Sequence, residues 1–109
     1  MSNPNQRQQY PPIDTAIFAN SANLSKEMIT DLYTITNQID TNPQFARRLM
    51  ELAQQGQRDQ VIALVNSLPL THRPDVTFTP GAVVIKILPA NPSNNSAFLA
   101  LTLIWKQSF

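Results

Sequence analysis

The stretch that decides the fold is Asp75-Val76-Thr77-Phe78-Thr79-Pro80-Gly81-Ala82-Val83-Val84-Ile85-Lys86-Ile87-Leu88, followed after a polar segment by Phe98-Leu99-Ala100-Leu101-Thr102-Leu103-Ile104-Trp105. Its β-branched and aromatic residues predict strands at about 75–79, 82–88 and 97–106. Pro80-Gly81 predicts a type II turn, because proline fixes φ at the first central position and glycine accepts a positive φ at the second. With 89–96 as a polar hairpin loop, the three strands form an antiparallel meander.

The second and third predicted strands are apolar on both faces. On the third strand, Leu99, Leu101, Leu103 and Trp105 share one face, and Phe98, Ala100, Thr102, Ile104 and Lys106 share the other. We therefore expect helices to cover one face of the sheet and part of the other, and the pattern leaves open which face the helices take.

The residues before the sheet predict three to four short helices over about 14–68. A brief helix capped by Asp14 or Thr15 would carry Ile17 and Phe18. A second helix would begin after Ser25 and place one apolar stripe toward the core, made of Leu24, Met28, Leu32, Ile35 and Ile39. Glu27 and Asp31 are expected on the solvent side of that helix.

Two further helices are bounded by clear start and stop signals. The third begins either with Asn42 as cap and Pro43 at the first helical position, or with Thr41 as cap and Gln44 reaching back. Gly56 is the expected left-handed stop of that helix. A fourth helix follows at about 57–67, and Pro69 ends it. The fold class is thus α+β: residues 1–9 form a disordered arm, and residues 10–109 form one domain with helices at 14–68 and a meander at 75–106.

Composition excludes several function classes. A net charge of +1 argues against a dedicated nucleic-acid binder, which needs a basic face. The absence of cysteine excludes disulfide frameworks and thiolate sites, and fits a reducing, cytoplasmic compartment. The longest apolar run, at 98–105, is far too short for a membrane span.

No reactive centre is evident in the sequence. His72 is the single histidine and lies three residues before Asp75, but a catalytic triad would need Ser67 or another serine beside it and an oxyanion hole. A structural histidine in a linker is the favoured interpretation. The Glu27 and Asp31 pair lacks a pocket that would tune either carboxyl for acid–base work. We predict no catalytic residue, no cofactor and no metal site, and hence a non-enzymatic protein.

The third strand favours an assembly role. It is expected at the sheet edge, it contains no proline, and its one charge is Lys106 at the end. Natural edges are usually blunted by charge or bulges, so this edge predicts pairing with a partner, although a helix or the N-terminal arm could instead cover it. Low charge, 14% of residues, also favours association, so we expect a homo-oligomer. The predicted interface comprises Phe98, Leu99, Leu101, Leu103, Ile104 and Trp105.

The alternative function is that of a small cytoplasmic regulatory module that binds a peptide or ligand in a helix–sheet groove.

Three short stretches, in this order, resemble small inner spore-coat proteins of endospore-forming bacilli. They are Tyr10-Pro11-Pro12-Ile13-Asp14-Thr15, Phe45-Ala46-Arg47-Arg48-Leu49-Met50 and Asp75-Val76-Thr77-Phe78-Thr79-Pro80-Gly81. The resemblance spans residues 10–106. It implies a non-enzymatic component, made in the mother-cell cytoplasm and deposited on the spore, that associates with itself or with other coat proteins; it transfers no catalytic residue. The absence of cysteine and the presence of only two tyrosines depart from many coat proteins and leave the mode of cross-linking open. Ten glutamines and three lysines would offer partners for isopeptide bonds.

Overall fold

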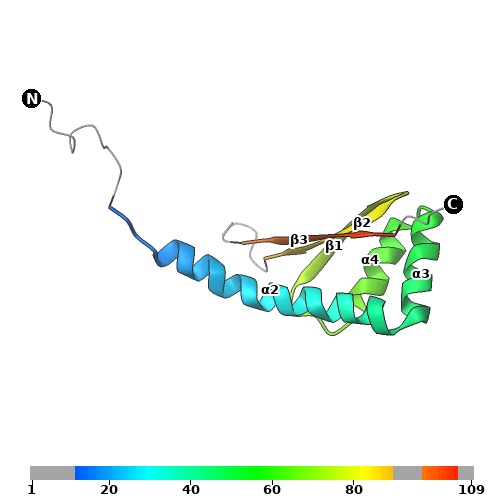
Figure 1. The fold of residues 1–109 in the computed structure, drawn as a ribbon, viewed down its shortest axis with the longest axis horizontal. Helices are drawn as coiled ribbons and strands as arrows, with labels where there is room; N and C mark the ends of the chain where they lie inside the picture. Colours follow the sequence, from blue (N-terminus) through cyan, green and yellow to red (C-terminus); the bar gives the residue numbers. More distant parts are fainter. Residues whose placement is uncertain (1–11, 90–96, 106–109) are drawn as a thin grey trace, which may run out of the picture.

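Three helices and a three-stranded sheet make up the computed structural model of the protein, which describes residues 12–89 and 97–105. The longest helix runs beneath the sheet, and the other two stand at one end of it (Figure 1). The helices are α2 (Ala16–Thr41), α3 (Pro43–Gln54) and α4 (Arg58–Asn66). The strands are β1 (Arg73–Thr79), β2 (Ala82–Leu88) and β3 (Leu99–Ile104), in the order β1-β2-β3 and antiparallel throughout. The predicted α+β class and the antiparallel meander are confirmed. The predicted arm, 1–9, lies outside the described residues.

The first two predicted helices are one continuous helix, α2, of 26 residues and about 39 Å. The start near Asp14 and Thr15 is confirmed, and Asp14 Oδ1 accepts a hydrogen bond from the Ala16 amide (2.9 Å). The predicted start at Ser25 is wrong. Ser25 Oγ instead donates to the carbonyl of Ala22 (2.6 Å) within the helix. No glycine or proline lies between residues 16 and 41, so no residue there forces the helix to end.

The predicted signals around α3 are confirmed, with Asn42 as its cap. Asn42 Oδ1 accepts from the Phe45 amide (3.2 Å), and Pro43 is the first helical residue. Gly56 has φ +71°, and its amide donates to the carbonyl of Ala53 while the Gln57 amide donates to the carbonyl of Leu52. This pair of bonds is the Schellman arrangement, which ends α3 and turns the chain into α4.

The turn between β1 and β2 differs from the prediction. Thr79 pairs with Ala82, so Pro80-Gly81 is a two-residue turn, but Gly56 is the glycine with positive φ and Gly81 is not. A type II turn is therefore wrong here. Proline suits the first central position of type I as well as type II turns, so the sequence alone does not choose between them. Gly81 is held by its neighbours: its amide donates to Thr79 Oγ1 (3.3 Å), and its carbonyl accepts from the Trp105 amide (3.2 Å).

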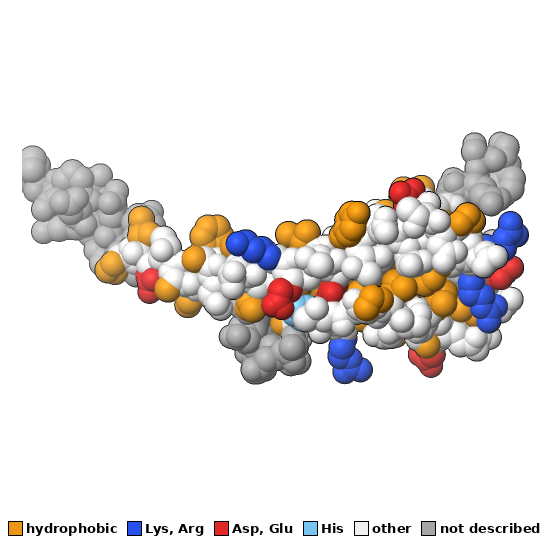
Figure 2. All heavy atoms as spheres, turned by 90° about the horizontal axis from the view of Figure 1, so that it is seen from below, with side chains coloured by type: hydrophobic (Ala, Val, Ile, Leu, Met, Phe, Trp, Pro, Cys, Tyr) orange, Lys and Arg blue, Asp and Glu red, His pale blue; other side chains and the backbone are white. Residues whose placement is uncertain are grey.

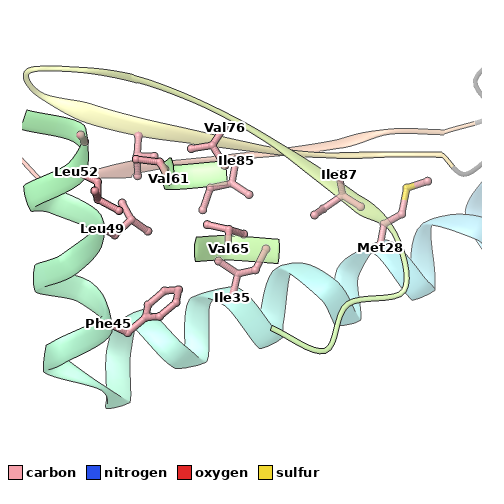
Figure 3. Close-up of a cluster of buried hydrophobic side chains, with 12 residues drawn as sticks. Met28, Ile35, Phe45, Leu49, Leu52, Val61, Val65, Val76, Ile85 and Ile87 are labelled. Carbon is pink, nitrogen blue, oxygen red and sulfur yellow. The ribbon is translucent and has the colours of Figure 1, made fainter. Parts of the chain in front are cut away.

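The core lies between the helices and one face of the sheet (Figure 3). Its buried hydrophobic members come from all three helices and from β1 and β2: Met28, Ile35, Phe45, Leu49, Leu52, Ala53, Val61, Val65, Val76, Val83, Ile85 and Ile87. The helices therefore take the face that carries Ile85 and Leu101. The partial cover expected on the second face is not supplied by any element within 12–89 and 97–105. That face mixes polar and apolar side chains, as in the cross-strand row of Thr77, Val84 and Thr102.

Candidate interaction surface

The outer edge of β3 presents unpaired backbone groups. In the antiparallel ladder the N–H and C=O of alternate residues point to opposite sides of a strand. The Trp105 amide donates toward β2, to the Gly81 carbonyl. By alternation, Leu103, Leu101 and Leu99 also face β2, whereas Ala100, Thr102 and Ile104 direct their N–H and C=O groups outward. No described strand pairs with this edge, which therefore offers three donors and three acceptors.

The opposite edge, on β1, is obstructed in its first half by two features. The same alternation turns the backbone groups of Pro74, Val76 and Phe78 outward on β1. Proline has no N–H, so the donor at that place is missing. The Val76 carbonyl accepts from Arg58 Nε (3.0 Å), and Arg58 Nη2 also pairs with Asp75 Oδ1 (2.7 Å). The β1 edge is thus obstructed at Pro74 and Val76, whereas no comparable obstruction lies along β3 in the described residues, and β3 is the predicted edge.

The structure divides the six predicted interface residues into two groups. Phe98 and Ile104 are exposed, with 65% and 75% of their surface accessible. The others face the helix layer and are half-buried: Leu99, Leu101, Leu103 and Trp105. Trp105 also serves the fold, because its Nε1 donates to the Thr79 carbonyl (3.0 Å) and its ring lies 6.2 Å from that of Phe78. Nothing in the fold tests whether these six residues bind a partner, so the interface stays a prediction.

A groove of about 390 Å³ opens beside the start of β3. One wall is the N-terminal half of α2, with Phe18, Ser21, Ala22 and Ser25, and the other is the segment Ala97, Phe98 and Leu99. No charged residue lines it, and Phe18 is 78% exposed. This is the helix–sheet groove that the alternative prediction requires, and two predicted interface residues, Phe98 and Leu99, form part of it.

The solvent side of α2 carries several exposed apolar side chains. Ile29 and Tyr33 are 55% and 67% exposed, and they lie one and two turns beyond Ser25 on the side of the helix that borders the groove. Figure 2 shows hydrophobic side chains recurring along the helix on the face seen from below. We refer to Phe18, Ala22, Ile29 and Tyr33 as the α2 stripe.

The position expected for Asp31 is wrong, because its side chain is buried (2% exposed). Its carboxylate accepts hydrogen bonds from the amides of Thr71 (2.9 Å) and His72 (2.8 Å), and lies 3.1 Å from His72 Nδ1. Since a carboxylate is an acceptor, Nδ1 carries the hydrogen in this contact. The signal was present in the sequence: Asp31 lies three residues after Met28 and four before Ile35, on the apolar side of the helix.

This pair joins α2 to the start of β1. His72 is in the linker, as predicted, and its side-chain partner is Asp31 and not the nearby Asp75. Ser67 Oγ donates to the carbonyl of Leu64 (2.6 Å) and not to the histidine. Glu27 is exposed, so it does not join Asp31 in a carboxylate pair. The chemistry of this contact is that of a structural link.

Two other kinds of feature are absent from the described residues. Across 12–89 and 97–105, no three acidic or histidine side chains come together as metal ligands. Among those same residues, no helix has both the length and the hydropathy that crossing a bilayer demands.

The fold and its surfaces define a small α+β domain with one open sheet edge, a neighbouring apolar groove and a structural histidine. Residues 15–98 match the family model of the YuzC spore coat inner layer protein, and the chain belongs to that family. The resemblance drawn from the sequence is thereby confirmed, and membership indicates a structural role in the spore coat. No curated protein and no solved structure gives a significant match.

Proposed function

We propose that the chain is a non-enzymatic building block of the coat inner layer that associates with copies of itself through the open edge of β3. On this proposal it is made in the mother-cell cytoplasm and assembles on the developing spore. The single observation that carries the proposal is the contrast between the two sheet edges: Pro74 and Arg58 obstruct the β1 edge at residues 74 and 76, and no described residue obstructs the β3 edge.

An unpaired strand edge is a template for another strand, and soluble monomers usually block it. The β3 edge has neither a charged side chain nor a proline within Leu99–Ile104. Exposed Ile104 and Phe98 extend the apolar surface at both ends of the strand. A protein that assembles into a layer gains from such an edge, because strand pairing needs no further cofactor.

Two matched substitutions test this proposal. Thr77 and Thr102 both pair with Val84, on the same face of the sheet, but lie on opposite edge strands. Thr102→Lys places a charge at the open edge and is expected to weaken self-association at least ten-fold, measured by sedimentation equilibrium over a concentration series. Thr77→Lys is the control and should associate like the unmodified protein. Equal behaviour of the two variants, or a monomer at every concentration, refutes the proposal.

The groove between α2 and β3 favours the regulatory alternative, in which a peptide or ligand binds between Phe18 and Phe98. Light scattering separates the two functions. The structural function requires oligomers whose mass rises with concentration, whereas the regulatory function is carried out by a monomer.

A further inference from the structure

We propose that the second copy pairs with the first as a two-fold symmetric dimer in which β3 meets β3 and the α2 stripe meets the α2 stripe beneath them. This inference rests on the proposed function and names the second half of the interface. Both halves are solvent-exposed parts of the fold and lie side by side.

The sides of α2 are assigned by the contacts around its axis. Asp31 contacts the linker that precedes β1. Phe18, Ser21, Ala22 and Ser25 border the groove at the start of β3, so the β3 side is another side of the helix. Ile29 and Tyr33 follow Ser25 at successive intervals of four residues, and such residues share one side of a helix. The stripe therefore lies on the flank of α2 next to the open edge.

The register of the strands follows from the outward backbone groups. Ala100, Thr102 and Ile104 point outward, with Thr102 in the middle. A two-fold axis at Thr102 pairs Thr102 with its own copy and Ala100 with Ile104 of the second copy. All the outward N–H and C=O groups of these three residues then find partners, because each pair is of the hydrogen-bonded kind.

The spacing between the two helices fits the same arrangement. α2 contacts both β2 and β3. Its axis therefore lies beneath the gap between them, about 5 Å from the two-fold axis when strands are about 4.8 Å apart. The two copies of α2 are then about 10 Å apart, at the upper end of the 8–10 Å range at which helices pack. Strand pairing by itself brings the two stripes into contact.

The residue at the two-fold axis can also be named. α2 and β3 run in the same direction (Figure 1), and Leu99 lines the groove together with Ala22 and Ser25. Three residues of strand from Leu99 to Thr102 cover about 10 Å, which equals about seven residues of helix. The helix residues beneath Thr102 are then those at 29–32, and Ile29, which is the member of the α2 stripe among them, faces Ile29 of the second copy. Phe18 is eleven residues away, about 16 Å along the helix, so its two copies are about 33 Å apart.

Single cysteines test this geometry cleanly because the chain has no cysteine of its own. In the full-length protein, Ile29→Cys is expected to form a covalent dimer on mild oxidation, since the facing Cα atoms come within the range of about 4.4–6.8 Å that a disulfide allows. Phe18→Cys is the matched control: it is also an exposed apolar residue of the stripe, and it should remain uncrosslinked. Non-reducing electrophoresis gives the readout, and analytical ultracentrifugation of the unmodified protein gives the oligomeric state.

The outcomes separate this inference from the proposed function. A cross-linked Ile29→Cys with an uncrosslinked Phe18→Cys supports the symmetric dimer. If the protein associates and Thr102→Lys disrupts it, but Ile29→Cys does not cross-link or both cysteines cross-link equally, the α2 stripe is not the second half of the interface. If the unmodified protein is monomeric at every concentration, both proposals fail.

Discussion

Replacing Asp31 by alanine is expected to destabilise the fold by about 3–5 kcal/mol. The carboxylate is 2% exposed and accepts from the amides of Thr71 and His72 and from His72 Nδ1. Alanine leaves two backbone N–H groups without an acceptor in a part-buried position, at a cost of about 1–3 kcal/mol each. Removing one partner of a buried ion pair typically destabilises a protein by about 3–5 kcal/mol, which agrees with this sum. Against a total stability of about 5–15 kcal/mol for a domain, this is a large fraction.

The measurement is urea unfolding followed by circular dichroism and by the fluorescence of the single tryptophan, Trp105, whose indole is bonded to the β1–β2 turn. Protein concentration is held constant, because self-association shifts apparent stability. Glu27→Ala, one turn earlier on the same helix and exposed, is the control and should lie within about 0.5 kcal/mol of the unmodified protein. The free energy of unfolding of Asp31→Asn, which keeps one acceptor oxygen, should lie between the values for Asp31→Ala and Glu27→Ala.

His72→Ala separates the backbone bonds from the ring contact. It removes the ring, with its Nδ1 contact and its packing, but leaves both amides bonded to Asp31, so its loss should be smaller than that of Asp31→Ala. The double variant should cost less than the two single losses added, because the two side chains share one contact. A loss below about 1 kcal/mol for Asp31→Ala would contradict the assignment of this contact as the link between α2 and β1.

Three further substitutions test single contacts of the fold by the same urea titration, followed by circular dichroism alone because one of them removes Trp105. Gly56→Ala should cost about 1–2 kcal/mol from the positive φ alone, because no heavy atom lies within 4 Å of the added Cβ; a neutral effect would contradict the left-handed turn. Arg58→Ala should lower the free energy of unfolding by about 1 kcal/mol and free the Val76 carbonyl on the β1 edge. Larger oligomers would support this second effect, and an unchanged oligomer size would contradict it. Trp105→Phe keeps an aromatic ring against Phe78 but loses the donor to the Thr79 carbonyl, so we expect a loss of about 0.5–1.5 kcal/mol; no change would mean that the bond to Thr79 contributes nothing.

Local signals in the sequence determined most of the secondary structure. Asn42 and Pro43 start α3, and Gly56 ends it, because each meets a local backbone requirement that few other residues meet. The runs of β-branched and aromatic residues likewise predicted the strands, and the Pro80-Gly81 turn and the polar segment at 89–96 predicted their antiparallel order. The same reasoning failed at Ser25, where a serine that resembles a helix cap is accommodated inside α2 by bonding to the preceding turn.

Only the tertiary structure decided which groups are buried and which edge is free. Asp31 looked like a solvent-facing acid because its burial depends on a linker forty residues later in the chain. The β3 edge was predicted from the lack of charge and proline, but its contrast with β1 depends on Arg58, whose contact with Val76 spans eighteen residues. The groove and the α2 stripe have the same origin, since a helix face is exposed or covered according to where the sheet lies. Periodicity is a property of neighbouring residues, whereas burial and edge protection are set by contacts between distant ones.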